Sequence, residues 1–170
     1  MVIGPNFAMG YRREGTFPVL KKLGLHNTFS VEQITPFEIN GTLINSTGIR
    51  AHLASGDVEK ISSYLGRYFS ITGNVEHGEG RGSSQLGFPT INLRIDESQA
   101  IPAEGIYAAC VDVKGIRYIA AASIGRKPTF YSGGRLVVEA HLLDYSGDLY
   151  DQRIKLNFVK HIREQKHFDK

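Results

Sequence analysis

The sequence lacks features that define several classes of protein. Its single cysteine, Cys110, excludes an internal disulfide and fits a reducing compartment. No stretch approaches the roughly 20 apolar residues of a membrane-spanning helix, and the first residues lack the charged-then-apolar pattern of a signal peptide. We therefore expect a soluble, cytoplasmic protein with no membrane partner.

An excess of charge of one sign is also missing. Lysine and arginine number 20 and aspartate and glutamate 17, so the formal net charge is only +3. This excess is too small to indicate nucleic acid as a partner. The histidines show no metal-ligand spacing, and with one cysteine a structural zinc site has little support. The sequence leaves the oligomeric state open.

The first part of the chain, residues 1–66, has a mixed helical and irregular pattern. Thr16 is placed to cap a short helix that Gly24 would end. Helical spacing predicts a later helix from Val58 to Leu65, closed by Gly66. Two weaker predictions are a strand over Phe29–Ile34 and a helix after Asn45.

From Ile71 onward the hydrophobic period becomes alternating and glycine becomes frequent, which is typical of strands. Six strands are predicted: Ile71–Val75, Thr90–Leu93, Tyr107–Val113, Arg117–Ser123, Leu136–Asp144 and Ile154–His161. Lys114-Gly115 predicts a tight hairpin turn. Six short strands favour a closed antiparallel barrel, because closure removes exposed sheet edges.

A glycine-rich stretch precedes the second predicted strand. Its glycines are Gly78, Gly80, Gly82 and Gly87. They let backbone N–H groups approach a bulky anion, and Arg81 adds positive charge, so the loop can hold phosphates. It is not a P-loop, since Phe88 and Pro89 occupy the required lysine and hydroxyl positions, and the dinucleotide fingerprint fails as well. A glycine-rich hairpin without a ligand explains the composition equally well.

Thr90 and Asn92 lie two positions apart, so both side chains project from the same face of an extended strand. A hydroxyl and an amide oxygen are hard, neutral ligands of the kind that complete a Mg²⁺ shell beside nucleotide oxygens. Two polar residues on a solvated face are the simpler interpretation of this pair alone.

Glu139 follows three apolar residues and precedes more of them. A carboxylate in such a strand is costly to desolvate unless it has a partner or a task, so a general base is one interpretation. An outward-facing strand glutamate is the commoner case. His141 shares the same face, where it could orient a ligand or serve as an ordinary structural histidine.

Two cations and an aromatic ring, Arg163, Lys166 and Phe168, come together near the end of the sequence. They could clamp a flat, partly anionic ligand by charge and stacking. The start of a solvated helix is the alternative.

Taken together, residues 73–170 resemble the riboflavin kinases, because several unusual segments occur in that family's order. They are Gly78 to Gly87, Phe88-Pro89-Thr90-Ile91-Asn92, Gly105-Ile106-Tyr107, Ile124-Gly125 with Pro128-Thr129-Phe130, Glu139 through Asp148-Leu149-Tyr150, and Arg163 to Phe168. The resemblance implies a mainly β fold, a six-stranded antiparallel Greek-key barrel. It also implies Mg²⁺-dependent transfer of the γ-phosphoryl of ATP to riboflavin, giving FMN.

The family's pattern also implies roles for single residues. Thr90 and Asn92 would hold Mg²⁺, and Glu139 would deprotonate the ribityl 5′-hydroxyl. The implied ATP-binding residues are Gly78, Gly80, Arg81, Gly82, Ser84, Thr90, Leu142, Asp144 and Tyr150, and the implied flavin-binding residues are Arg163, Lys166 and Phe168. Ser84 stands where a basic residue is common in the family, which would loosen ATP binding.

Residues 1–66 resemble the later part of the α/β FMN adenylyltransferase domain of bacterial bifunctional FAD synthetases. Gly4 to Gly10 and Ile44 to Arg50 carry this likeness, and Ser46, Thr47 and Arg50 would contact triphosphate. The acidic pair usual in that domain is replaced by Pro5-Asn6. We therefore expect a partial adenylyltransferase domain over 1–66 and a kinase barrel over 67–170 that lacks the family's C-terminal helix.

Two other functions remain open from the sequence. FMN adenylyl transfer, which makes FAD, is supported by the N-terminal part alone and is expected only of a longer chain. The other is a non-catalytic barrel that binds a flavin, or an oligonucleotide on aromatic faces.

Overall fold

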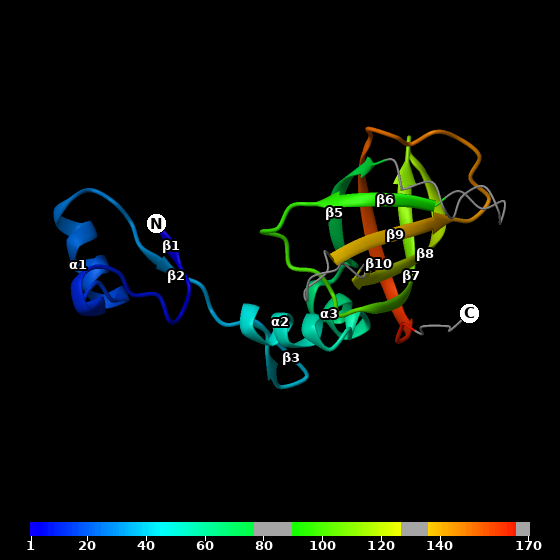
Figure 1. Ribbon diagram of the computed structural model, residues 1–170. Helices are drawn as coiled ribbons and strands as arrows, with labels where there is room; N and C mark the ends of the chain where they lie inside the picture. The colour runs from blue at the N-terminus through cyan, green and yellow to red at the C-terminus, as the bar shows by residue number, and fades with distance from the viewer. Residues whose placement is uncertain (77–89, 127–135, 166–170) are drawn as a thin grey trace. The chain divides into compact units, whose positions relative to one another are not determined.

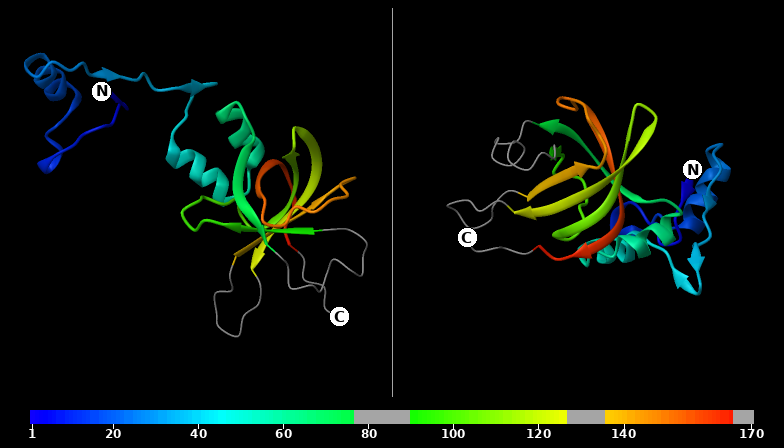
Figure 2. Two further views of the ribbon diagram at one scale, coloured as in Figure 1. Left: turned by 90° about the horizontal axis from the view of Figure 1, so that it is seen from above. Right: turned by 90° about the vertical axis from the view of Figure 1, so that its right-hand side faces the viewer.

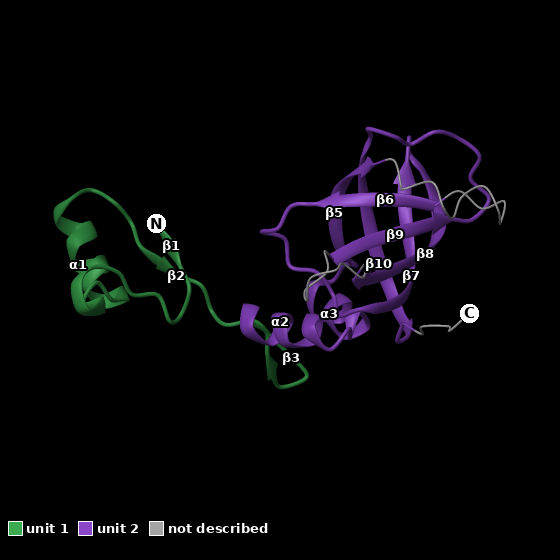
Figure 3. Cartoon of the chain, in the orientation of Figure 1, with its two compact units in different colours: residues 1–45 green, residues 46–170 purple. Residues whose placement is uncertain are grey.

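The computed structural model describes residues 1–76, 90–126 and 136–165. The chain divides into two compact units, residues 1–45 and 46–170, which are coloured separately in Figure 3. The second unit begins about twenty residues before the boundary predicted at 66/67, so it includes two helices that precede the barrel.

The first unit contains short elements and little buried surface. They are β1 (Val2–Ile3), the 3₁₀ turn η1 (Tyr11–Arg13), α1 (Phe17–His26), β2 (Glu32–Gln33), β3 (Glu38–Ile39) and β4 (Thr42–Leu43). Strand β1 pairs in parallel with β2, and β3 pairs with β4 in a hairpin. Strand β2 lies within the stretch where alternation predicted one.

Helix α1 continues past the predicted end at Gly24, so that prediction was wrong. Gly24 is buried, and a Cβ atom placed on it would clash with the Phe29 carbonyl oxygen. The glycine therefore permits a close approach of the chain within the helix rather than a left-handed cap. Thr16 occupies the N-cap position, but its side chain makes no capping hydrogen bond.

The second unit opens with α2 (Ser46–Ala54) and α3 (Val58–Leu65). The Asp57 side chain caps α3 by accepting a hydrogen bond from the Lys60 N–H at 3.1 Å. Gly66 ends the helix in the left-handed region at φ 65°, as predicted. Val58 and Ile61 have no exposed surface, and α3 packs on β5 and β10, so it belongs with the barrel.

The barrel consists of the six predicted strands, most of them longer than expected. They are β5 (Phe69–Glu76), β6 (Thr90–Ile95), β7 (Gly105–Val113), β8 (Ile116–Arg126), β9 (Leu136–Leu142) and β10 (Arg153–Arg163). They close in the order β10-β5-β6-β9-β8-β7, and every neighbouring pair is antiparallel. Figures 1 and 2 show the strands wrapping around one core. The connections β6–β7 and β9–β10 each pass over two strands, as in a Greek key.

Alternation places one set of strand residues inside the barrel. The buried members include Ile71, Leu93, Tyr107, Val138 and Leu156, each at most 6% exposed. The residues between them face outward. The β7–β8 turn has Lys114 at φ 49° and Gly115 at φ 83°, the two left-handed positions of the predicted hairpin.

Candidate active site

Polar side chains from three neighbouring strands line up across the outer face of the barrel. Asn92 on β6 is the direct partner of Glu139 on β9, and Glu139 is the direct partner of Ser123 on β8. Thr90 pairs in the same way with His141. Direct partners in an antiparallel sheet project to the same face with Cβ atoms about 4.5–5.5 Å apart. The register therefore gathers the predicted metal ligands and the predicted base in one patch.

Glu139 faces outward, and its apolar sequence neighbours face the core. Val138 and Ala140 are 1% and 0% exposed, whereas Glu139 is half-buried. The alternation of the strand thus explains how a carboxylate occurs in an apolar run. Asn92 and Ser123 flank it and are also half-buried, so Glu139 is partly shielded from solvent on both sides.

A small hollow of about 100 Å³ lies beside Glu139. Its lining residues are Ser123, Gly125, Arg126, Val137, Glu139 and Gln165. The Gln165 Nε2 group donates a hydrogen bond to Ser123 Oγ at 2.9 Å. A Cβ atom on Gly125 would lie 2.4 Å from Gln165 Nε2, so the absence of a side chain at Gly125 lets the glutamine reach the serine.

Arg126 supplies the positive charge at the edge of this hollow. Its Nε group forms an ion pair with Glu104 Oε1 at 2.9 Å, and both side chains are about half exposed. An exposed ion pair of this kind orients the side chains more than it stabilises the fold. The candidate site therefore combines one carboxylate, one guanidinium and several neutral hydrogen-bonding groups.

The donor set fits a hard divalent cation that nucleotide oxygens help to bind. Thr90 and Asn92 are both half-buried on the outer face, and their hydroxyl and amide oxygens are suitable ligands for Mg²⁺. The described part of the chain contains no cluster of three or more His, Cys, Asp or Glu residues that could hold a metal by itself. Oxygen atoms of a nucleotide would suit the remaining positions of such a cation's coordination shell.

The other predicted ATP residues that the structure describes lie at the end of β9 and beyond it. Leu142 is 2% exposed and belongs to the core. Asp144 and Tyr150 lie in the connection to β10, where Asp144 has a positive φ of 57° and Tyr150 is 40% exposed. These two side chains are accessible.

The remaining predicted residues fall in several places. Arg163 is exposed at the end of β10 and donates a hydrogen bond from Nη1 to the Glu164 carbonyl at 3.0 Å. Ser46, Thr47 and Arg50 lie together in the first half of α2. Gly78, Gly80, Arg81, Gly82, Ser84, Lys166 and Phe168 lie outside the described residues.

Ser123 and Gln165 were missed as site residues in the sequence. Ser123 is the one polar residue in the run from Ile119 to Gly125, which is a signal that could have drawn attention to it. Gln165 gives no such signal, because its contact with Ser123 joins positions 42 residues apart. Only the register of the closed barrel brings it to Glu139.

The whole-chain architecture matches a known one. A crystal structure described as a macrolide-efflux protein from Streptococcus pneumoniae superimposes with a TM-score of 0.82 at 29% sequence identity, covering 99% of this chain and 54% of that one. No helix within residues 1–76, 90–126 and 136–165 is long and apolar enough to cross a membrane. The fold and the outer-face site thus define a closed six-stranded barrel with a polar site on its outer face.

The sequence model of the riboflavin kinase family matches residues 65–170, so the chain belongs to that family. It is 37% identical over 166 residues to a bifunctional riboflavin kinase/FMN adenylyltransferase of Pseudomonas fluorescens, covering 98% of this chain and 53% of the relative. The protein of the same name from Bacillus subtilis is 34% identical over 172 residues, with 99% and 53% covered. The chain spans about half the length of the curated relatives it matches.

Proposed function

We propose that this chain transfers the γ-phosphoryl group of ATP to the 5′-hydroxyl of riboflavin, giving FMN and ADP. Membership of the riboflavin kinase family supports this reaction class. The register that pairs Asn92 with Glu139, with Thr90 on the same face, is the observation that carries the proposal. It supports the proposal because hydroxyl and amide oxygens, which can bind a metal–nucleotide complex, lie next to a carboxylate, which can accept a proton.

Glu139 is the candidate general base. It would accept the proton of the 5′-hydroxyl as that oxygen attacks the γ-phosphorus, while positioning supplies much of the catalysis. The hydroxyl of Ser123, held by Gln165, lies on one side of the carboxylate and the amide of Asn92 on the other. These neighbours would orient the substrate hydroxyl and keep bulk water away from the carboxylate.

Thr90 and Asn92 would hold Mg²⁺ together with phosphate oxygens of ATP. The bound ion would neutralise charge on the transferring phosphoryl group. Asp144 and Tyr150, with the loop residues Gly78 to Ser84, would contact the nucleotide. Arg163, Lys166 and Phe168 would contact the flavin.

Incubation with riboflavin and Mg·ATP, followed by chromatographic separation of riboflavin, FMN and FAD, tests the activity. We expect FMN to accumulate with one ADP released per FMN. Binding of both substrates without any FMN formation would contradict the proposal and favour a non-catalytic flavin-binding barrel.

Replacement of one metal ligand tests where the nucleotide binds. Thr90→Val removes the hydroxyl and should weaken Mg·ATP binding about tenfold, the scale of one lost interaction with a charged group, with metal-free ATP little affected. Thr42→Val, an exposed strand position in the first unit, is the matched control. Equal Mg·ATP affinity in the two variants would remove Thr90 from the site.

A second candidate function is FMN adenylyl transfer by a longer protein. It is favoured by the names of the relatives, whose alignments cover 98% and 99% of this chain and therefore most of residues 1–45. Incubation of residues 1–170 with FMN and Mg·ATP is expected to give no FAD. FAD formation would assign the second activity to this chain.

A further inference from the structure

A second hollow lies on the outer surface of the barrel, over β10, β7 and β8 and beside the end of α3. Its volume is about 500 Å³, which falls in the range of small-molecule sites. The lining residues are Ser62, Gly66, Arg67, Tyr68, Asp112, Arg117, Lys155 and Asn157. None of them lines the hollow beside Glu139.

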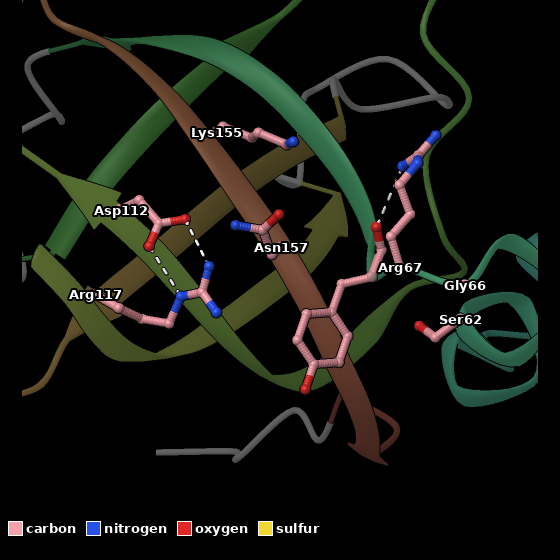
Figure 4. Close-up of a pocket in the computed structure, with 8 residues that line it drawn as sticks. Ser62, Gly66, Arg67, Asp112, Arg117, Lys155 and Asn157 are labelled. Atoms are coloured by element: carbon pink, nitrogen blue, oxygen red, sulfur yellow. Dashed lines mark hydrogen bonds and ion pairs between the residues drawn. The ribbon is translucent and has the colours of Figure 1, made fainter. Parts of the chain in front are cut away.

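Three cations from three separate segments line this hollow. Arg67 comes from the turn after α3, Arg117 from β8 and Lys155 from β10. Figure 4 shows Lys155 and Asn157 along β10, with the Asp112–Arg117 pair on one side and Arg67 and Ser62 on the other. Asp112 is the one carboxylate of the lining, so the lining carries two more positive than negative charges.

The single carboxylate of the lining, Asp112, already forms an ion pair with Arg117. Arg117 Nε and Nη2 donate to the two Asp112 carboxylate oxygens at 2.9 and 3.0 Å, a bidentate pair. The Arg117 guanidinium holds the pKa of the Asp112 carboxyl below its usual range. Among the described residues the Arg67 guanidinium donates only to the Tyr68 carbonyl, at 3.3 Å. The Lys155 ammonium forms no hydrogen bond or ion pair with them, although its charge helps to lower the pKa of the Asp112 carboxyl. Arg67 and Lys155 therefore remain available to an anion.

The floor of the hollow contains a buried amide. Asn157 is 7% exposed, and it is the only buried polar residue in the part of the chain that the structure describes. Its Nδ2 group donates to the Cys110 carbonyl at 3.3 Å, a long bond. Asn157 lines the hollow, and its Nδ2 group has a second hydrogen that can be donated to water or to a ligand there. A bound anion would supply the acceptor.

We propose that this hollow is a binding site for a phosphate group, either free or as the monoester of a small molecule. Arg67 and Lys155 would supply charge-assisted hydrogen bonds from two sides and the Asn157 amide a neutral one from the floor. The Asp112–Arg117 pair fixes the third cation at the edge. Tyr68, 41% exposed, offers a ring on which a flat group attached to the phosphate can stack.

Titration of the full chain with inorganic phosphate, without nucleotide or flavin and at constant ionic strength, tests the site by ¹H–¹⁵N NMR. The Asn157 side-chain amide signals should shift saturably, because that group lies at the floor. Lys155→Gln should weaken the affinity read from these signals about tenfold, the scale of one charge-assisted hydrogen bond. Lys160→Gln is the matched control, since Lys160 is an exposed lysine of the same strand that pairs with Glu59 outside the hollow.

A repeat titration with phenyl phosphate separates the two sources of the phosphate. Tighter binding than inorganic phosphate identifies a monoester with a flat group, and equal binding identifies the free ion. The absence of a saturable Asn157 shift, or equal weakening by Lys155→Gln and Lys160→Gln, would overturn the proposal. Both exchanges are at exposed positions, so folding is preserved, and the readout does not depend on kinase activity.

Discussion

Glu139 shows how much one position depends on its cross-strand neighbours. The sequence left two interpretations open, a costly carboxylate in an apolar strand and an ordinary outward-facing glutamate. The structure makes it outward-facing and also half-buried between Asn92 and Ser123. The two interpretations therefore do not exclude each other, because an outward-facing carboxylate can still be partly shielded by neighbouring strands.

Glu139→Gln tests this position directly. The exchange keeps the shape and removes the proton acceptor, so turnover to FMN should fall about 10²–10⁴-fold while binding of Mg·ATP persists. Steady-state kinetics and a nucleotide-binding titration give the two numbers. Glu97→Gln, in the turn after β6, is the control and should keep full turnover; a Glu139→Gln enzyme of normal rate would exclude the base.

The buried hydroxyl of Tyr107 should make the free energy of unfolding depend on pH. Its hydroxyl donates to the Ala103 carbonyl at 2.6 Å, and burial, with a smaller effect of Glu164, raises the pKa of Tyr107 to about 12 from an ordinary value of 10.0. Between these values the unfolded chain releases the proton and the folded chain keeps it. The contribution is complete below pH 10 and is lost as the pH rises toward 12.

Urea unfolding of wild type and Tyr107→Phe at pH 8 to 11.5 measures this effect. At pH 8 the variant should be less stable by about 1 kcal/mol because it lacks the hydrogen bond. As the pH rises above 10, the wild type should lose this lead. A difference that stays constant with pH would show that the hydroxyl keeps an ordinary pKa in the folded state.

At the scale of elements, helix α3 is a structural part of the barrel unit. Val58 and Ile61 are fully buried on a helix whose periodicity was evident in the sequence, and the left-handed Gly66 turns the chain into β5. The pattern therefore predicted the helix and its end. It could not predict which strands the apolar face covers, because that depends on the closure of the barrel.

Ile61→Ala should lower the free energy of unfolding by about 2–5 kcal/mol, the usual cost of a cavity left by a large buried side chain. Thermal or urea unfolding measures this value. The control is Ile119→Ala on β8, where the side chain is 64% exposed, and its effect should stay within about 1 kcal/mol. Similar losses in both variants would mean that α3 does not pack as described.

The six strands were predictable because each alternates and ends at a glycine, a turn or a polar cluster. The row Asn92–Glu139–Ser123 was predictable only in part. Thr90 and Asn92 share a face by simple spacing, but Ser123 and Gln165 reach Glu139 through strand register and a long-range hydrogen bond. Sequence spacing carries no information about either.

At the scale of the whole molecule, the boundary between the two compact units predicts which fragment of the chain can fold by itself. Residues 46–170 form one compact unit, whereas the family model begins at residue 65. A fragment of 46–170 should keep the unfolding transition of the barrel. A fragment of 67–170 lacks Val58 and Ile61 and should unfold at least 5 °C lower, since about 1 kcal/mol shifts the midpoint of such a domain by roughly 4–8 °C.

Calorimetry of the two fragments measures these midpoints. Equal midpoints would show that α2 and α3 contribute nothing to the barrel and would return the boundary to residue 66. A loss of the transition in 46–170 would show that residues 1–45 are needed for it.

Strand β10 pairs with both β5 and β7, so the barrel closes only when this last strand of the sequence is in place. During synthesis β5 and β7 each keep an unpaired edge until β10 (Arg153–Arg163) has been made. The same topology links residues more than eighty positions apart, such as Phe69 and Phe158, which implies slow folding. Protection of those edges by a ribosome-associated chaperone would then matter more for this protein than for one whose sheets close as they emerge.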